Sequence, residues 1–337
     1  MKKKMTYKQA GVDIGGYDRL VPFIKRQLRG ASDECGGGLF AGMIDLNRYS
    51  KAERLVVASV DGVGTKVRVA TEYGWHGGIG RDIVAHCVDD VLCLGARPIG
   101  FMDYVAFDRL DTAVFKQIVK GIVRECKAND IQLIGGETAE MPGVYRKGEY
   151  DLVGCILGLA SPGKTLDGSR IKKGDLLVGL PSNGLHTNGY SLARKVLVER
   201  GHLDLRARPK GWKRTLGRAL LLPHTNYFDQ VHPLVEMKRL SGIAHITGGG
   251  IRGNLSRILP DGLSAGLRRD LWKVPPIFNL IRDTGPVEDD EMLRVFNMGL
   301  GMILVTPHKY LPQVLKHTRA SRVVGEIGDG NGDVVIE

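Results

Sequence analysis

The stretch at residues 80–98, GRDIVAHCVDDVLCLGARP, constrains the fold most, because it predicts a helix whose two sides differ in chemistry. At about 100° per residue, its apolar side chains gather on one side that suits a hydrophobic core. The opposite side is a polar stripe roughly 100° wide, and it carries Asp82, His86, Asp89, Asp90 and Cys93. Carboxylates crowded on one helix face repel each other unless a cation or water separates them. The stripe is therefore either a solvated outer face or part of a metal site.

Strand and helix patterns alternate along the chain, whose 337 residues suggest two domains at roughly 100–200 residues each. The first half predicts helices at 17–29 and 111–127 and strands at 54–60, 99–106, 131–134 and 150–160. The second half predicts strands at 175–180, 243–246, 301–305 and 323–327 and helices at 189–200, 226–240, 251–258, 276–283 and 289–296. The polar segment 161–173 predicts a linker. We expect an α+β fold of two α/β-layered domains, residues 1–164 and 165–337.

Composition narrows the function classes. The net charge of +11 favours anionic partners, but the basic residues are scattered and aromatic content is only 6%, so we expect no nucleic-acid partner. Five cysteines without a CxxC pair predict reduced thiols rather than disulfides or a zinc site. No apolar run approaches the roughly 18–20 residues that span a bilayer, and no signal-peptide pattern opens the chain. We therefore expect a cytoplasmic protein with no membrane partner.

One motif match is rejected. Residues 158–165, GLASPGKT, fit the G-x-x-x-x-G-K-[ST] pattern of a phosphate-binding P-loop. That mechanism needs a helix that begins at the lysine, because the helix N-terminus contributes its dipole to phosphate binding. Here about ten residues with two glycines lead directly into the next predicted strand, which is too little for a crossover helix.

Acidic and polar clusters at predicted strand and helix ends point to a nucleotide site instead. They are Asp61, Asp89 with Asp90, Glu137 with Thr138, and the segment 186–188. Carboxylate oxygens suit magnesium, which binds one or two carboxylates together with nucleotide phosphates. Each cluster alone is as well explained by a turn, and His186 as a hydrogen-bonded turn histidine. We expect His86 to be structural. The joint occurrence of the clusters favours the nucleotide site.

Several motifs in a fixed order then resemble one enzyme family. They are YKQAGVD at 7–13, DGVGTK at 61–66, DVLCLGARP at 90–98, GGETAEMPG at 135–143, SNGLHTNGYSL at 182–192, HITGGG at 245–250 and FN at 296–297. Together they resemble the aminoimidazole ribonucleotide synthetase family from about residue 7 to the C-terminus. The resemblance implies two α+β domains, a homodimer formed by the N-terminal domains, and an ATP site near the dimer interface.

The resemblance also implies an activity, an ATP-dependent ring closure in purine biosynthesis. The γ-phosphoryl group of ATP activates the formyl amide oxygen of formylglycinamidine ribonucleotide. The amidine nitrogen then attacks, and ADP, phosphate and aminoimidazole ribonucleotide are released. Such a reaction needs positioning and charge neutralisation more than covalent chemistry from the protein. Magnesium is the expected metal, and a monovalent cation such as K⁺ is left open.

Site residues follow from the matched motifs. The implied catalytic residues are His186, Lys66 and Asp61, and it stays open whether His186 transfers a proton or polarises the substrate. The implied ATP-binding residues are Lys25, Asp61, Lys66, Asp90, Gly95, Glu137 and Thr138. The implied metal ligands are Asp61, Asp89, Asp90 and Glu137. The implied substrate-binding residues are Asn188, Thr247, Gly248, Gly249 and Gly250, of which the glycines would hold the 5′-phosphate on backbone amides. Asp82 is left with a solvated or capping role.

The chain departs from the family pattern at a few positions. Asp89 stands where the family usually has Asn, and PHTNY at 223–227 lacks the Arg of the family's Pro-Thr-Arg-x-Tyr. Val60 replaces Thr, and Met298 replaces Cys. Related alternatives are selenophosphate synthetase, thiamine-monophosphate kinase and the hydrogenase-maturation ATPase. Cys35 beside three glycines is a superficial match to the first, but GGETAEMPG favours the synthetase. A non-catalytic nucleotide-binding regulator is the alternative from another class.

Overall fold

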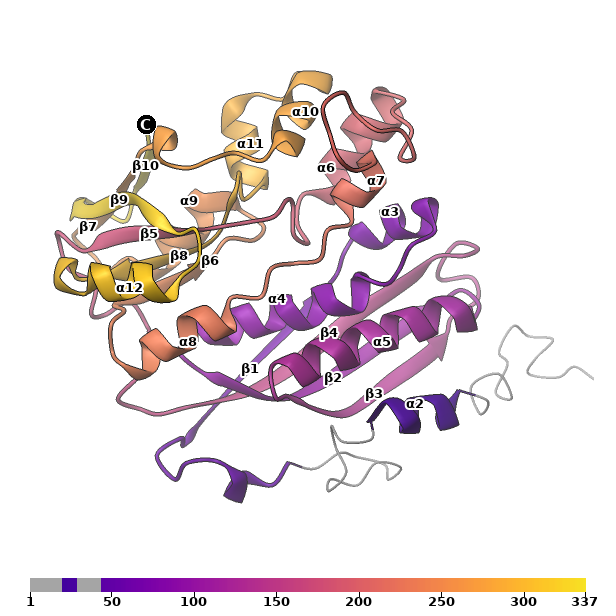
Figure 1. The fold of residues 1–337 in the computed structure, drawn as a ribbon, viewed down its shortest axis with the longest axis horizontal. Helices are drawn as coiled ribbons and strands as arrows, with labels where there is room; N and C mark the ends of the chain where they lie inside the picture. Colours follow the sequence, from indigo (N-terminus) through magenta and orange to yellow (C-terminus); the bar gives the residue numbers. More distant parts are fainter. Residues whose placement is uncertain (1–19, 29–43) are drawn as a thin grey trace, which may run out of the picture.

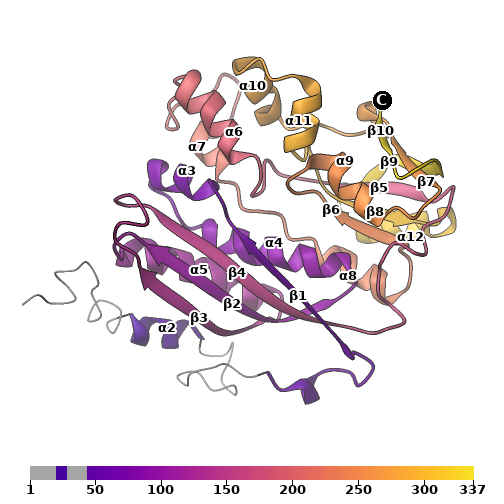
Figure 2. The same cartoon turned by 180° about the vertical axis from the view of Figure 1, so that it is seen from behind.

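The computed structural model describes residues 20–28 and 44–337, and within them it shows two α/β-layered domains (Figure 1). The first domain contains a four-stranded sheet of order β1-β4-β2-β3, in which only β2 and β3 run parallel. Its strands are β1 (Leu55–Gly62), β2 (Arg97–Phe107), β3 (Gln132–Glu140) and β4 (Tyr150–Ala160). Helices α4 (Ile79–Cys93) and α5 (Thr112–Ala128) cover one face, and α2 (Val21–Leu28) packs against α5. No described helix covers the opposite face, which is in front in Figure 2.

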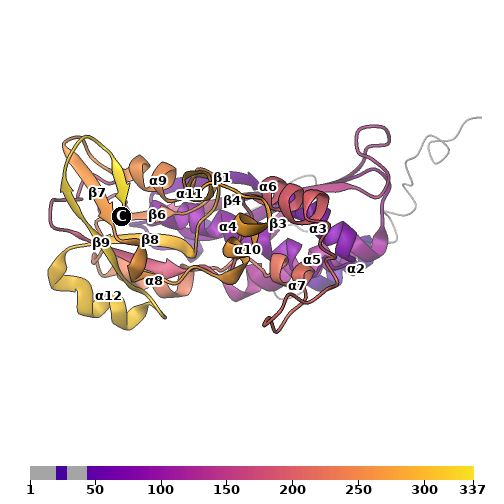
Figure 3. The same cartoon turned by 90° about the horizontal axis from the view of Figure 1, so that it is seen from above.

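The second domain contains a six-stranded sheet of order β10-β7-β9-β5-β8-β6. Its strands are β5 (Leu176–Pro181), β6 (Gly242–His245), β7 (Leu263–Leu267), β8 (Leu300–Thr306), β9 (Arg322–Asp329) and β10 (Val334–Ile336). Its helices are α6 (Tyr190–Arg194), α7 (Leu216–Leu220), α8 (Phe228–Glu236), α9 (Gly250–Leu255), α10 (Pro276–Thr284), α11 (Asp289–Val295) and α12 (Leu311–His317). Seen from above, this domain lies beside the first, with edge strand β6 toward it (Figure 3). The expected fold class is confirmed.

The helix predicted within residues 80–98, with one apolar and one polar side, is α4, and it lies between the domains. One side contacts β1, β2 and β4 of the first sheet, and another contacts β6 and α8 of the second domain. Ile83, Val84 and Val88 are fully buried on the first side, as an apolar core side requires. The polar side is buried too, because Asp82 and Asp89 have no solvent exposure. A solvated role for Asp82 is therefore wrong: the polar stripe forms the seam between the domains.

Local signals explain the well-predicted elements. Asp111 caps α5, because its side-chain oxygen accepts hydrogen bonds from the amides of Ala113 and Val114 at 2.8 and 3.1 Å. The rejected P-loop match begins in the last three residues of β4, and none of residues 161–175 is helical. Its Lys164 instead forms an ion pair with Glu236. The rejection is confirmed, and the domain boundary predicted at 164/165 lies between β4 and β5.

Some elements were not predicted. They are α3 (Lys66–Tyr73), α7, α12, β7 and β10. The helix predicted at 189–200 is α6 followed by a π-helical segment, Lys195–Arg200. Across the described ranges, every helix is too short or too polar to cross a membrane.

Candidate functional site

Two partly exposed carboxylates form the outer part of the site. Asp61 lies near the end of β1 and Asp90 near the end of α4, and their side chains are 40% and 26% exposed. Both approach the same nitrogen, Nε2 of His86, at 2.9 Å for Asp61 and 3.9 Å for Asp90. The structure therefore brings together the two acids to which the sequence assigned ATP and metal binding. Exposed carboxylate oxygens at this spacing are a suitable donor set for magnesium.

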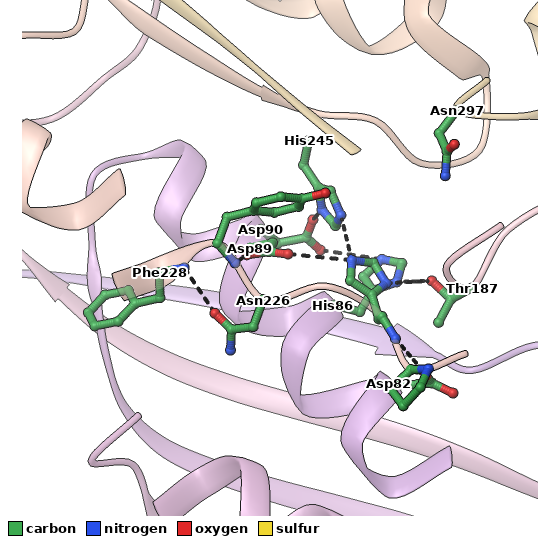
Figure 4. Close-up of polar contacts among 12 residues, drawn as sticks. Asp82, His86, Asp89, Asp90, Thr187, Asn226, Phe228, His245 and Asn297 are labelled. Atoms are coloured by element: carbon green, nitrogen blue, oxygen red, sulfur yellow. Dashed lines mark hydrogen bonds and ion pairs between the residues drawn. The ribbon is translucent and has the colours of Figure 1, made fainter. Parts of the chain in front are cut away.

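Buried imidazoles hold these carboxylates in place. His245, the last residue of β6, donates from Nδ1 to Asp90 Oδ1 at 2.8 Å, so the pair spans the domain seam (Figure 4). His86 is 3% exposed, and its Nδ1 lies 2.6 Å from the hydroxyl of Thr187. His86 thus links Asp61 of the first domain to the 186–188 segment of the second, which is the structural role predicted for it.

A third imidazole and a third carboxylate lie deeper in the seam. His224 Nε2 is 3.1 Å from His245 Nε2 and 3.4 Å from Asp89 Oδ2. Asp89 Oδ1 accepts the amide of Tyr227 at 3.0 Å, and neither Asp89 nor His224 has an exposed side chain. Asp89 is therefore closed off from any nucleotide bound at the surface. The prediction that it shares a magnesium ion with ATP does not fit this placement.

Burial and neighbouring charges set the protonation of the cluster. Burial lowers the pKa of His86, but the hydrogen bond to Asp61 and the charge of Asp90 outweigh it, so the pKa is raised above its usual value. Burial raises the pKa of Asp90, but the hydrogen bonds from His245 and Ser59 and the charges of His245 and His86 together outweigh it, so that pKa is lowered. Burial alone dominates at His224, whose pKa lies well below its usual range, and at Asp89, whose pKa lies well above.

His186 differs from the expected hydrogen-bonded turn histidine. Its backbone has a left-handed φ of 60°, and its side chain is buried with no hydrogen-bond partner at either ring nitrogen within the described chain. The ring stacks on His224 with centroids 4.1 Å apart. Its space exists because residue 301 is glycine, where a Cβ would meet His186 Cε1 at 2.5 Å. Burial lowers the pKa of His186 well below its usual value, which keeps the ring neutral.

Lys66 was expected to face ATP phosphates, and the structure corrects this. Its side chain is fully buried at the start of α3, where Nζ forms an ion pair of 2.9 Å with Asp82. The same Nζ donates to the carbonyl oxygens of His186 and Leu222, each at 2.8 Å. With its donors engaged inside the protein, Lys66 holds the seam rather than a surface phosphate.

Gly95 was expected to contact the cofactor, and it too is structural. It ends α4 with a φ of 75°, a conformation that favours glycine. A Cβ there would lie 2.9 Å from the carbonyl oxygen of Lys164 and 3.0 Å from Val235. The residue is glycine because the interdomain segment and α8 pack directly on it.

Glu137 and Thr138 lie on β3, the strand at the far edge of the first sheet. The register aligns Asp61 with Gly154 of β4, Asp103 of β2 and Gly136 of β3. Three strand spacings put Glu137 about 14 Å from Asp61. The structure does not bring Glu137 to the Asp61–Asp90 pair within one chain. Glu137 is exposed at its edge.

The predicted substrate-phosphate residues do come together. Gly248 and Gly249 are exposed before α9, and a Cβ on Gly248 would lie 3.4 Å from the side-chain oxygen of Asn188. Among the described residues, the amides of Gly248 and Gly249 have no hydrogen-bond partner. Asn254 fixes the loop by donating to the carbonyl of Gly250 at 2.8 Å and accepting from Thr247 at 3.3 Å. Such a loop can bind an anion on its amides.

Other predicted positions lie outside what the structure describes. Lys25 belongs to α2, but its side chain is outside the described part, as are the motif at 7–13 and Cys35 with its glycines. Sequence reasoning missed Thr187, His224 and His245 as site residues. His245 opens the HITGGG motif and His224 replaces a family residue, so both carried a signal. Their meeting with Asp89 and Asp90 required the fold.

Comparisons with known proteins agree with this architecture. Family models described as AIR synthase related protein match the chain in two parts, the N-terminal domain at residues 41–160 and the C-terminal domain at 172–337. A phosphoribosylformylglycinamidine cyclo-ligase of Myxococcus xanthus is 46% identical over 97% of both chains. One of Alkaliphilus metalliredigens is 39% identical over 99% of this chain and 98% of the relative.

Solved structures share the fold at low identity. A thiamine-monophosphate kinase from Stenotrophomonas maltophilia has a TM-score of 0.69 at 17% identity, covering 94% of this chain and 95% of the other. The hydrogenase maturation protein HypE in complex with ATP also has a TM-score of 0.69, at 18% identity, covering 95% and 91%. At this identity they support the fold alone.

Proposed function

The chain belongs to the AIR synthase related family. We propose that its active site is the seam around Asp61 and Asp90, and that it catalyses there the reaction for which its cyclo-ligase relatives are named. The activity is phosphoribosylformylglycinamidine cyclo-ligation, an ATP-dependent ring closure of purine biosynthesis. One observation supports the assignment to this seam. Two partly exposed carboxylates, Asp61 and Asp90, both approach His86, and both domains contribute residues there. The residues that act and the order of the steps are our proposal.

Asp61 and Asp90 would hold magnesium with the ATP phosphates, because their oxygens are accessible and of the type that magnesium prefers. When bound, the metal neutralises charge on the transferring phosphoryl group. His86 and His245 keep the two carboxylates fixed, so little reorganisation is needed at the moment of reaction.

The proposed chemistry has two steps. The formyl amide oxygen of formylglycinamidine ribonucleotide attacks the γ-phosphorus of ATP, and ADP leaves. The amidine nitrogen then attacks the activated carbon, the carbon–oxygen bond breaks, and phosphate departs with that oxygen. His186 is our candidate for moving a proton or orienting the substrate, because its ring nitrogens are not engaged by other described groups. Its burial means that substrate reaches it only when the 186–188 segment opens.

We place the substrate's 5′-phosphate at Gly248–Gly250, with Thr247 and Asn188 beside it. The free amides of Gly248 and Gly249 support this placement. The nucleotide would then lie at Asp61 and Asp90 and the phosphate on the second domain, so that ring closure takes place at the seam. Closure of the domains would exclude water from the activated substrate.

A homodimer formed by the first sheet is also part of the proposal. The sheet face opposite α4 and α5 exposes Val56 and Val60 at 65% and 64%. Exposed apolar side chains on an uncovered sheet favour a partner surface. In such a dimer, the β3 edge of one subunit, with Glu137 and Thr138, would lie near the ATP site of the other. A cytoplasmic location is proposed with it, and the need for a monovalent cation is left to measurement.

The experiment combines the chain with formylglycinamidine ribonucleotide, ATP and magnesium and follows ADP and the aminoimidazole product. We expect both products in equal amounts, and neither when the ribonucleotide is omitted. Thiamine monophosphate serves as the alternative acceptor, because a kinase of that substrate shares the fold. ADP formed only with thiamine monophosphate would overturn the proposal.

A further inference from the structure

Deep in the domain seam, three buried side chains from different parts of the chain bring possible metal-ligating atoms close together. Asp89 comes from α4, His224 from the segment before α8, and His245 from the end of β6. The candidate ligand atoms of these three residues all lie within 4.8 Å of one another. We propose that Asp89, His224 and His245 bind a divalent transition-metal ion of the zinc type, separate from the magnesium proposed at Asp61 and Asp90.

The hydrogen bonds around the cluster determine which nitrogens carry protons. His245 Nδ1 faces a carboxylate oxygen of Asp90, so it carries the hydrogen and leaves a lone pair on Nε2. His86 Nε2 faces Asp61 at 2.9 Å, and its Nδ1 lies 2.6 Å from the hydroxyl oxygen of Thr187. The same Thr187 oxygen lies 3.3 Å from His224 Nδ1. When the His224 hydrogen is on Nδ1 and donated to Thr187, a lone pair is left on Nε2, as metal binding requires.

In that tautomer the Nε2 lone pairs of His224 and His245 face each other. The Nε2 atoms of His224 and His245 are 3.1 Å apart, and Asp89 Oδ2 lies 3.4 Å from the first of them. Asp89 Oδ2 is buried and has no hydrogen-bond partner within the described chain. Ligands of a tetrahedral zinc ion at about 2.0–2.2 Å are separated by about 3.3 Å. The observed spacings of 3.1 and 3.4 Å are close to this ligand–ligand distance. A cation bound between these atoms would remove the repulsion among their lone pairs.

The surroundings are those of a metal centre as well. His245 is backed by a carboxylate, which fixes its ring and tautomer, and His224 is backed by a hydroxyl, which orients its ring. Two imidazoles with one carboxylate favour zinc and similar ions over magnesium, which takes oxygen ligands. A pocket of about 380 Å³ is lined by Arg81, Glu125 and His224 among others, so it borders one of the three proposed ligands.

Two of the proposed ligands, Asp89 and His224, are positions where the chain departs from the motifs of the family it resembles. The site is thus a property of this chain beyond the family's reaction. Its ligands come from both domains, so the ion would fasten α4 to the second domain. Through His245 it would also support Asp90.

The test uses the full chain, stripped with a chelator and then equilibrated with zinc or cobalt in excess magnesium. We expect one equivalent retained after desalting, a raised melting temperature, and cobalt absorption bands typical of tetrahedral nitrogen and oxygen ligation. Asp89→Asn keeps the acceptor for Tyr227, and His224→Thr restores the family residue. Each removes a direct ligand and should weaken zinc binding by more than the about 10–100-fold that loss of an outer-shell partner costs, whereas His317→Gln, at an exposed histidine, should not weaken it.

Loss of binding in a variant counts only if its metal-free circular dichroism matches that of the parent. Zinc retention and the cobalt spectrum of the parent protein test the proposal without any variant. If it retains no zinc in excess magnesium, or if its cobalt spectrum is octahedral, the proposal is overturned. Unchanged stoichiometry and affinity in both Asp89→Asn and His224→Thr would overturn it as well.

Discussion

Lys66 and Asp82 form an ion pair of 2.9 Å in which neither side chain is exposed to solvent. The pair also ties α3 and α4 to two further segments, because Lys66 donates to the carbonyls of His186 and Leu222 while Asp82 accepts the amide of His224 at 2.6 Å. Burial lowers the pKa of Lys66 and raises the pKa of Asp82 to about 6, with the partner's charge opposing the shift in each case. The lysine that ends the motif DGVGTK thus stabilises the site through buried contacts to the segments around it.

Breaking this pair should destabilise the protein strongly. Lys66→Met leaves a buried carboxylate without its cation, and Asp82→Asn leaves a buried ammonium, so each should cost about 3–5 kcal/mol of unfolding free energy. The double variant should cost clearly less than the sum. Denaturant unfolding of all four proteins measures the coupling. A cost below about 1 kcal/mol for Lys66→Met would return Lys66 to the ATP site.

Removing the charge of either outer carboxylate should impair turnover. Asp90→Asn and Asp61→Asn should each lower kcat by about 10²-fold or more, because both acids are proposed to position magnesium and the phosphates. Asp283→Asn, at an exposed surface position, is the matched control and should retain full activity. Melting curves check that the site variants are folded. Full activity in Asp90→Asn would remove Asp90 from the catalytic machinery.

Two glycines of α9, Gly250 in the proposed phosphate loop and Gly253 outside it, allow a matched pair of substitutions. Gly250 has a φ of 63°, and a Cβ there would collide with the carbonyl oxygen of Leu293. Gly250→Ala should therefore destabilise the protein and raise the KM for the ribonucleotide. Gly253→Ala adds a Cβ in open space in the same helix. It should leave the KM unchanged and stabilise the helix by about 0.5–1 kcal/mol. Equal effects of the two substitutions would contradict a special role for the loop.

The uncovered sheet face should control assembly. Val60→Asp places a charge on the proposed dimer surface, where Val60 is 64% exposed in one chain. Analytical ultracentrifugation should show the mass falling from dimer to monomer. Val335→Asp, at a 49% exposed position on β10, is the control and should stay dimeric. A monomeric parent protein, or a Val60→Asp dimer of undiminished stability, would rule out this interface.

Regular elements with local signals could be predicted from the sequence. Helix α5 has a capping aspartate and an apolar stripe, and β4 is a long run of apolar residues, so both were placed within a residue or two. Strand β7, LSAGL, has no β-branched residue and contains a glycine, and β10 has only three residues. The pairing of β10 with β7, and of β7 with β9, is decided by the sheet, which no local pattern encodes.

The site shows the same division. The family resemblance assigns Asp61 and Asp90 to one site, and their shared approach to His86 is seen in the structure. The polar stripe of α4 was interpreted as solvated or metal-binding, whereas most of it is buried against the second domain. A one-dimensional pattern distinguishes polar from apolar faces, but it does not show that a polar face is paired with residues more than a hundred positions away, as Asp89 is with Tyr227.

The central claim is that the chain activates an amide oxygen by phosphorylation, and the fate of that oxygen tests it most directly. Formylglycinamidine ribonucleotide labelled with ¹⁸O at the formyl oxygen is turned over with ATP, and the released phosphate is analysed by mass spectrometry. If the oxygen attacks the γ-phosphorus, each phosphate released carries one labelled oxygen. Label found in water, with unlabelled phosphate, would contradict the account, because ATP would then be hydrolysed without activating the substrate.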